Sequence, residues 1–457
     1  MSARVQLVAF WVSACFGAGM VACVTANQRR TFDEDDETGA PLRDAESPID
    51  GGAPTDTATE KPPFSPDDEP ISCSTTPCAV EIVAGENHFC ARMSDGTARC
   101  WGDDRRGSLG GGEDAGGGVV RVAGLADAKQ LSAGGTTTCA LVSDGRVWCW
   151  GGNDTGQLGL APVDAVADDD RHPIPAPVAL GGDATRVDVG QSTACAVLTT
   201  GEVWCWGDNS RDQLARSTSR KIGAPAKAEL GDLHVTRTAA GSYTAFAVTE
   251  EGAVVSWGAV AGAEGSVAVR KTSLSSDPAP LPIGLSGVTS FSVSSTKLLP
   301  DDFPTRARGI AHACAIVDGG DVRCWGDTAW GATGAGLAGQ VPEPRSALVK
   351  SAIAWPREVT AAGDVTCVRL TDGTVQCAGD NASGALGRDP ATTTFSLLFE
   401  PASAFHARAL RIAASAHAVC AIVEGGAVVC WGSNERKQLG QNVADTDPHP
   451  SAVPVSF

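Results

Sequence analysis

The sequence predicts an all-β protein made of seven copies of one β-hairpin, and three observations lead to this prediction. The 457 residues include 54 Gly and 26 Pro but only 11 Trp, 12 Phe and one Tyr, which is typical of many short elements joined by turns. A pattern of Cys, nine residues and then Cys-Trp-Gly recurs at intervals of 49 to 68 residues. Glycine follows each first Cys position by six residues. Long helical bundles are therefore disfavoured.

Five copies of this pattern are complete, and they span residues 90–102, 139–151, 195–207, 314–326 and 420–432. One further copy keeps Cys367 and Cys377 but has Ala378 in place of Trp. Another has Phe246 and Ser256 in place of both Cys and keeps the Trp-Gly pair. The chain therefore contains seven copies.

The turn of each copy carries glycine at one fixed place, at Gly96, Gly145, Gly201, Gly252, Gly320, Gly373 and Gly426. A three-residue hairpin loop needs a left-handed residue at its third place, and glycine adopts that conformation without strain. With Ser94-Asp95-Gly96 as the loop, Cys90 lies opposite Cys100 and within disulfide reach. A two-residue turn would instead place Cys90 opposite Trp101.

The number of cysteines supports pairing within each hairpin. Sixteen Cys are too many for a chain kept reduced, so we expect an oxidising compartment. Setting aside Cys15 and Cys23, discussed below, leaves fourteen, with none left over: Cys73 and Cys78, and the repeat pairs Cys90 and Cys100, Cys139 and Cys149, Cys195 and Cys205, Cys314 and Cys324, Cys367 and Cys377, and Cys420 and Cys430. Zinc binding is disfavoured because the chain has neither CxxC spacing nor clustered His. We expect no metal or cofactor.

Residues 1–23 are predicted to be a lipoprotein-type signal peptide. Arg4 is followed by an uncharged, largely apolar stretch. Within it, Met20-Val21-Ala22-Cys23 resembles the lipobox of bacterial lipoproteins, which makes Cys23 the expected lipidation site. Cys15 fits the same pattern, and a signal that is cleaved without lipidation or an uncleaved anchor helix remain alternatives.

Residues 24–70 are predicted to be a disordered, acidic linker. From Thr31 to Pro70 there are 13 Asp or Glu, two basic residues and seven Pro. Such a segment buries too little surface to offset its ordering entropy, so we interpret it as a spacer rather than as a cation site. The whole chain has a net charge of −19, which repels phosphate backbones and anionic lipids. We therefore expect no nucleic-acid partner, and membrane contact only through an N-terminal lipid.

A second motif follows the Trp-Gly pair and identifies a family. It reads Trp-Gly-x-Asn and then Gln-Leu-Gly or Gln-Leu-Ala at residues 150–159, 206–215 and 431–440. Ala-Gly dipeptides such as Ala84-Gly85 and Ala133-Gly134 precede the first Cys position. Together these features resemble the regulator of chromosome condensation repeat. The resemblance covers residues 79–457, and residues 71–457 are assigned to the folded domain.

The resemblance implies a seven-bladed β-propeller with one blade per repeat. We expect the C-terminal strand at Pro454-Val455 to complete the first blade, begun near Ala79, and so to close the ring. The repeated Trp residues are expected to pack between blades. The family's eukaryotic namesake is an exchange factor for a small nuclear GTPase, and both export and acidity argue against that setting.

No catalytic motif appears in the sequence, and we predict that the protein is not an enzyme. It contains no GxSxG, HExxH or phosphate-loop pattern. His88, His312 and His417 recur two or three residues before a repeat Cys, which makes them elements of the scaffold.

Two insertions are the candidate functional segments. The first spans residues 295–308, and its candidate partner-binding residues are Lys297, Leu298, Leu299, Asp301, Asp302 and Phe303. They combine apolar anchors with charge on a rigid scaffold, as an interface needs. The alternative is that this insertion is a surface loop with no binding role. The second insertion, Ala161 to Arg171, carries Asp168, Asp169 and Asp170 as either a divalent-cation site or a solvated loop.

The sequence thus predicts an exported, monomeric propeller, membrane-anchored or extracellular, that acts as a scaffold for an unidentified protein partner. One alternative is a structural envelope module with no discrete partner. The other is an exchange-factor-like regulator, suggested by the family resemblance alone.

Overall fold

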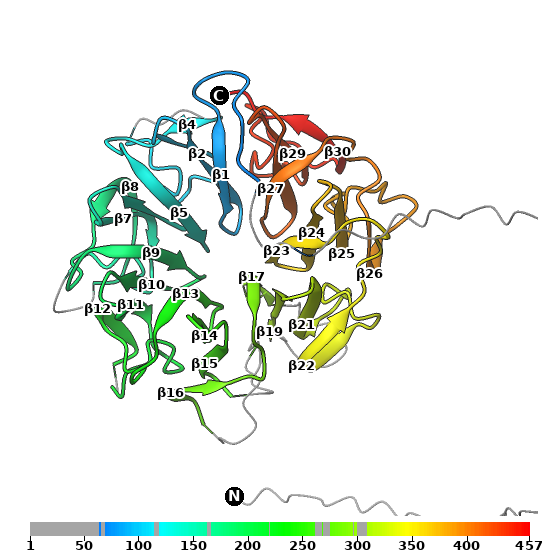
Figure 1. The fold of residues 1–457 in the computed structure, drawn as a ribbon. Helices are drawn as coiled ribbons and strands as arrows, with labels where there is room; N and C mark the ends of the chain where they lie inside the picture. Colours follow the sequence, from blue (N-terminus) through cyan, green and yellow to red (C-terminus); the bar gives the residue numbers. More distant parts are fainter. Residues whose placement is uncertain are drawn as a thin grey trace, which may run out of the picture. The chain divides into compact units, whose positions relative to one another are not determined.

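The computed structural model describes Phe64 and residues 69–113, 118–161, 166–218, 220–260, 267, 275–295, 297–298 and 309–457. A compact unit runs from Thr59 to Phe457. In it, seven four-stranded antiparallel sheets form a ring around a central axis (Figure 1). The prediction of an all-β, seven-bladed propeller is confirmed. Cys15 and Cys23 lie outside the described residues.

Each blade consists of four strands that follow one another along the chain, from the axis outward. The first three blades are β1 (Ala79–Ala84), β2 (His88–Met93), β3 (Ala98–Gly102) and β4 (Val120–Arg121); β5 (Ala128–Gly134), β6 (Thr137–Val142), β7 (Val147–Asn153) and β8 (Asp168–Pro177); and β9 (Ala184–Val189), β10 (Thr193–Leu198), β11 (Val203–Asp208) and β12 (Ile222–Lys227).

The fourth and fifth blades are β13 (Val235–Ala240), β14 (Thr244–Thr249), β15 (Val254–Gly258) and β16 (Asp277–Pro282); and β17 (Val288–Val293), β20 (His312–Val317), β21 (Asp321–Thr328) and β22 (Gly339–Ala347). The last two are β23 (Pro356–Ala362), β24 (Val365–Leu370), β25 (Val375–Asp380) and β26 (Phe395–Pro401); and β27 (Ala409–Ala414), β28 (Ala418–Val423), β29 (Val428–Gly432) and β30 (His449–Pro454).

The predicted closure of the ring by the C-terminal strand is wrong. Strand β30 pairs with β29 of its own blade, where Cys430 lies opposite Val453. The first blade already has its outer strand, because β4 pairs with β3. The chain reverses direction after each Cys-Trp-Gly strand. The free edge of that same strand is then the nearest one with which the following strand can pair. The Pro-Val segments therefore complete the preceding repeat rather than the next one.

Contacts between blades close the ring instead. The Trp101 indole Nε1 of blade 1 donates to the Gln438 carbonyl of blade 7 over 2.9 Å. The Phe457 ring lies 5.8 Å from the Trp101 ring, and the Ala79 amide donates to the Gly426 carbonyl over 3.1 Å. The first and last blades are thus joined much as any other neighbouring pair.

The predicted hairpin register is confirmed. Cys90 lies opposite Cys100, and the amide of Met93 donates to the Thr97 carbonyl across the three-residue loop over 2.8 Å. Gly96 has a φ of 77°, in the left-handed region that favours glycine. All six repeat pairs form disulfides across facing strands, with Cα atoms 4.0–4.1 Å apart. Cys73 and Cys78 are also joined.

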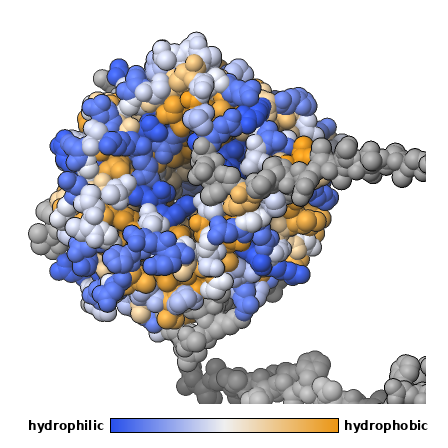
Figure 2. Space-filling model, viewed as in Figure 1, coloured by the Kyte–Doolittle hydropathy of each residue, from blue (hydrophilic) through white to orange (hydrophobic). Residues whose placement is uncertain are grey.

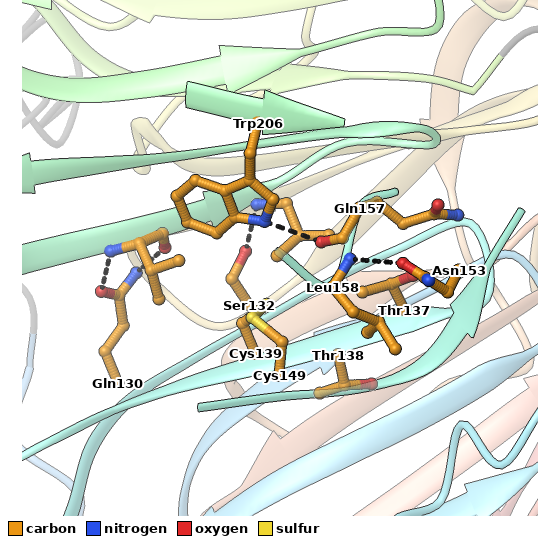
Figure 3. The surroundings of a disulfide bond; sticks show 12 residues. Gln130, Ser132, Thr137, Thr138, Cys139, Cys149, Asn153, Gln157, Leu158 and Trp206 are labelled. Carbon is orange, nitrogen blue, oxygen red and sulfur yellow. Dashed lines mark hydrogen bonds between the residues drawn. A yellow bond between two sulfur atoms is a disulfide. The ribbon is translucent and has the colours of Figure 1, made fainter. Parts of the chain in front are cut away.

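The repeated Trp side chains lie buried between blades. Trp206 of blade 3 contacts blade 2, where its Nε1 donates to the Gln157 carbonyl over 2.8 Å, close to the Cys139–Cys149 disulfide (Figure 3). Each of the six Trp residues donates in this way to the preceding blade, with blade 7 preceding blade 1, over 2.8–3.0 Å. The prediction that these residues pack between blades is confirmed.

Blade 6 lacks this Trp, and Phe399 of β26 occupies the corresponding space. Phe399 is fully buried with Ala378, which stands in the Trp position. Its ring lies against Gly334 of blade 5, just as the Trp206 ring lies against Gly159 of blade 2. The side chain missing from the third strand is therefore replaced from the fourth strand of the same blade.

Phe399→Leu should lower the free energy of unfolding by about 1–2 kcal/mol, because a smaller side chain leaves part of this gap unfilled. Phe395→Leu, on the exposed part of the same strand, should change it by less than about 0.5 kcal/mol. Urea unfolding of the oxidised protein measures both. Equal effects of the two substitutions would contradict the assignment of Phe399.

The ring has two faces that differ in their connections. On the loop face, the turn between the first two strands lies beside the loop after the third, since the Asp103 amide donates to the Asn87 carbonyl over 2.9 Å. On the hairpin face, the hairpin at Gly96 lies beside the link to the next blade, since the Ala128 amide donates to the Gly96 carbonyl over 2.9 Å. Both insertions therefore emerge on the loop face.

The segment before β1 contacts the hairpin face. The Phe64 ring lies 6.0 Å from the Trp355 ring, in the link between blades 5 and 6. Glu69 forms an ion pair with Arg408, and the Ser74 amide donates to the Gly425 carbonyl over 3.0 Å. Described residues at the end of the predicted linker thus pack on the propeller instead of spanning solvent.

Candidate functional site

The side chains of the repeated motif make contacts within the propeller itself. Asn153 Oδ1 accepts a hydrogen bond from the Leu158 amide, and Asn153 Nδ2 donates to the Val166 carbonyl. These two bonds fix the loop after the third strand of blade 2. Leu158 itself is buried. Equivalent Asn side chains hold the loops of blades 3 and 6. Contacts with a partner must therefore come from residues that the repeats do not share.

The histidines of the motif also join blades. Nε2 of His88 lies 2.8 Å from Oγ1 of Thr138 in the next blade, and Nε2 of His312 lies 2.6 Å from Oγ1 of Thr366. Burial lowers the pKa of both His88 and His312 to about 4, so both rings are neutral at pH 7. These contacts agree with a scaffold role.

The first insertion leaves the loop face as a short two-stranded stem. Strand β18 (Lys297–Leu298) pairs with β19 (Gly309–Ile310), with Lys297 opposite Ile310. Leu299, Asp301, Asp302 and Phe303 lie outside the described residues. The stem places the predicted partner-binding segment on blade 5, between its first and second strands.

The three aspartates of the second insertion do not converge on one point. Asp168 accepts hydrogen bonds from Asn153 Nδ2 and lies 2.7 Å from His172 Nε2. Asp169 forms an ion pair with Arg106 of blade 1 over 2.8 Å. Among the residues described, no group of three or more His, Cys, Asp and Glu is placed to hold a metal ion. The same part of the chain has no helix with the length and apolar character needed to cross a membrane.

A partly exposed apolar patch that the sequence did not reveal lies on blades 5 and 6. We call it the rim patch: Trp330, Phe395, Leu397 and Leu398. The Trp330 and Phe395 rings lie 6.0 Å apart, and Phe395 and Leu398 are 44% and 37% exposed. Trp330 belongs to the loop after β21 of blade 5, and Phe395 begins β26 of blade 6. The rim patch is therefore at the loop-face edge of these two blades.

The sequence does contain a feature that corresponds to the rim patch, but this feature does not recur in the other repeats. Residues 395–401 read Phe-Ser-Leu-Leu-Phe-Glu-Pro, a more apolar run than the other outer strands contain. Only Phe399 of this run is buried, since it fills the place of the missing Trp. Sequence alone could not tell which of the apolar residues faces inward.

A central channel runs between the blades of the described structure. Its volume is about 620 Å³, and its wall is formed by the innermost strands of the blades. Figure 2 shows the ring hollowed at its centre. Side chains bridge these strands, as when the Val187 amide donates to Gln130 Oε1 and the Val189 amide to Ser132 Oγ (Figure 3). Arg186, Asp188 and Arg237 also line the channel.

Comparison with known sequences agrees with the repeat pattern. Sequence profiles of the regulator of chromosome condensation (RCC1) repeat match residues 79–108, 128–157 and 184–213, and also residues 144–197. The mouse E3 ubiquitin-protein ligase HERC2 is 27% identical over 245 residues, which are 52% of this chain but 5% of the ligase. The mitochondrial RCC1 domain-containing protein RUG3 of Arabidopsis thaliana is 29% identical over 150 residues, covering 33% of this chain and 30% of RUG3. This chain thus spans only a small part of these relatives.

Solved structures share the fold. Prp20p of Saccharomyces cerevisiae, studied for its binding to Gsp1p and histones, has a TM-score of 0.63 and 19% identity over 85% of this chain and 88% of that one. The complex of Kap60 with yeast RCC1 (Prp20) gives a TM-score of 0.64, with 18% identity over 90% of this chain and 91% of that one. Human WBSCR16 has a TM-score of 0.60 and 19% identity over 81% of this chain and 94% of that one. At these identities the likeness establishes the fold alone.

Proposed function

Because this chain is a seven-bladed propeller of regulator of chromosome condensation repeats, we propose that it is an exported, membrane-anchored scaffold that binds a protein partner. The binding surface is the loop face at blades 5 and 6, comprising the rim patch and the insertion at residues 295–308. The partner presents an exposed apolar segment. Catalysis has no part in this proposal.

The rim patch is the observation that carries the proposal. Aromatic and aliphatic side chains that stay exposed together mark interaction sites on soluble proteins, whereas single exposed apolar residues need no explanation. Trp330 and Phe395 are of the types enriched at interfaces. The insertion between the first two strands of blade 5 would supply the charged surroundings that such a centre needs, through Lys297, Asp301 and Asp302.

The path of the N-terminal segment supports the choice of face. Phe64 and Glu69 contact the hairpin face, so the chain reaches the propeller from that side. These contacts occupy part of the hairpin face. Only the family likeness supports an exchange activity toward a small GTPase. The sixteen cysteines instead favour an oxidising compartment, where such a GTPase is not expected.

Phe395→Ser should weaken partner binding at least about tenfold, because truncating a central apolar residue of an interface removes much of its binding energy. A chain shortened at residues 299–308 should bind more weakly as well. The oxidised full chain and both variants are immobilised and exposed to envelope and culture-fluid proteins of the cells that make it. The proteins retained are then identified and quantified by mass spectrometry.

Ile353→Ser is the matched control. Ile353 is 54% exposed in the link between blades 5 and 6, on the hairpin face, so its loss should leave binding unchanged. The proposal is supported when one protein is retained by the full chain and the control but lost from the Phe395 variant. Equal retention by all four proteins would refute the assigned surface, and no specific retention would favour a structural envelope module.

A further inference from the structure

Two arginines from neighbouring blades line the central channel, and within the described part of the chain only Arg186 forms an ion pair with a carboxylate. Arg186 of β9 donates through Nε to both carboxylate oxygens of Asp188, each over 2.9 Å. Arg237 of β13 donates through Nη2 to the Phe291 carbonyl over 3.0 Å, and its buried Nε has no hydrogen-bond partner. Arg237 lines the channel, where the enclosed Nε is out of reach of a ligand and the terminal guanidinium nitrogens are the donors that a ligand could meet.

The nearby carboxylates are already engaged. Asp188 Oδ2 accepts from both the amide and the hydroxyl of Thr238, each over 2.9 Å, in addition to its bonds with Arg186. Glu81 of β1, the next acidic group near Arg186, accepts from Arg92 Nε over 2.8 Å and from the Leu131 amide over 3.1 Å. Among the described residues that line the channel, the two arginines are accompanied by Asp188 and, at the loop-face end, by Glu86. Arg237 itself forms no ion pair with a described carboxylate.

The positive charge of Arg237 is costly unless an anion joins it. Burial lowers the pKa of Arg237 to about 10, and the neighbouring Arg186 acts in the same direction. Arg237 nevertheless stays protonated at pH 7. A buried charge without a counter-ion and a buried donor without an acceptor both oppose folding.

We propose that the channel binds a small oxyanion, a carboxylate or a phosphate, between Arg186 and Arg237. The planar guanidinium presents parallel N–H donors whose spacing fits the oxygens of either group. The channel volume of about 620 Å³ is in the range of small-molecule sites. Glu86, Gln191 and Ser295 line the loop-face end of the channel.

The site is separate from the rim patch, and its test does not depend on a protein partner. The oxidised full chain is titrated with inorganic phosphate and, in parallel, with succinate, using isothermal titration calorimetry at low ionic strength. We expect one site per chain for at least one of these anions. Arg237→Met should weaken that binding by at least about tenfold, because the lost contact is charge-assisted.

Arg146→Met is the matched control, because Arg146 lies in an exposed hairpin and pairs with Asp144 away from the channel. Arg237→Gln is the second variant, and it keeps a polar side chain of similar length should the Met variant fail to fold. Binding retained by Arg146→Met and lost by an Arg237 variant supports the site. Absence of binding to the unmodified chain, or equal binding by the Arg237 variants, would overturn it.

Discussion

Trp206→Ala should lower the free energy of unfolding by about 3–5 kcal/mol, which is the usual cost of deleting a fully buried aromatic side chain. Trp206 packs into the core shared by blades 2 and 3, and its Nε1 satisfies the buried Gln157 carbonyl. The substitution creates a cavity and also leaves that carbonyl without its donor. Equilibrium unfolding in urea under non-reducing conditions measures the change.

Trp148→Ala is the control for this prediction. Trp148 is only partly buried, and Arg146 lies over its ring at 5.5 Å. Its loss should cost about 1–2 kcal/mol, since less apolar surface returns to water. If the two substitutions cost the same, the repeated Trp residues are not the main contacts between blades.

Gly151→Ala should cost about 3 kcal/mol or more, although it adds a single methyl group. Gly151 has a φ of 108°, and a Cβ at this position would lie 2.2 Å from the Thr136 carbonyl oxygen. That oxygen also accepts the Gly152 amide over 3.0 Å, so it cannot withdraw without breaking a hydrogen bond. Backbone strain and overpacking therefore add. Thermal and urea unfolding of the variant measure the loss.

Gly112→Ala separates the two causes. Gly112 has a φ of 88°, but a Cβ there would meet no atom within 4 Å. It should cost about 1 kcal/mol through strain alone. An effect at Gly151 no larger than that at Gly112 would contradict the close-approach explanation for the glycine that follows each repeated Trp position.

The hairpins could be predicted because every determinant lies within about a dozen residues. Turn length, the glycine at position 96 and the spacing of Cys90 and Cys100 all specify one register, and the structure has that register. The closure of the ring could not be predicted in the same way. The order of motifs along the chain does not say whether the strand at 449–454 pairs backward with β29 or across to β3, because both edges could accept it.

The candidate site was predictable only in part. An insertion relative to the other repeats, such as residues 295–308, can be found by counting along the chain. The rim patch depends on which apolar residues of β26 turn inward, and this follows from the absence of Trp at position 378 together with the space that Phe399 fills. Such compensation between two strands of a blade has no periodic signature. The sequence did not predict that Arg186 and Arg237 lie together, because the two residues belong to different repeats.

A photo-crosslinking amino acid placed at position 395 tests the central claim most directly. It is introduced into the full chain in the cells that make it, and the same residue is placed at position 353 in a parallel strain. We predict that irradiation joins position 395 to one discrete protein, through an apolar segment of that protein, and that position 353 gives no such product. Crosslinking of the same protein from both positions, or of none from either, would contradict a partner-binding loop face.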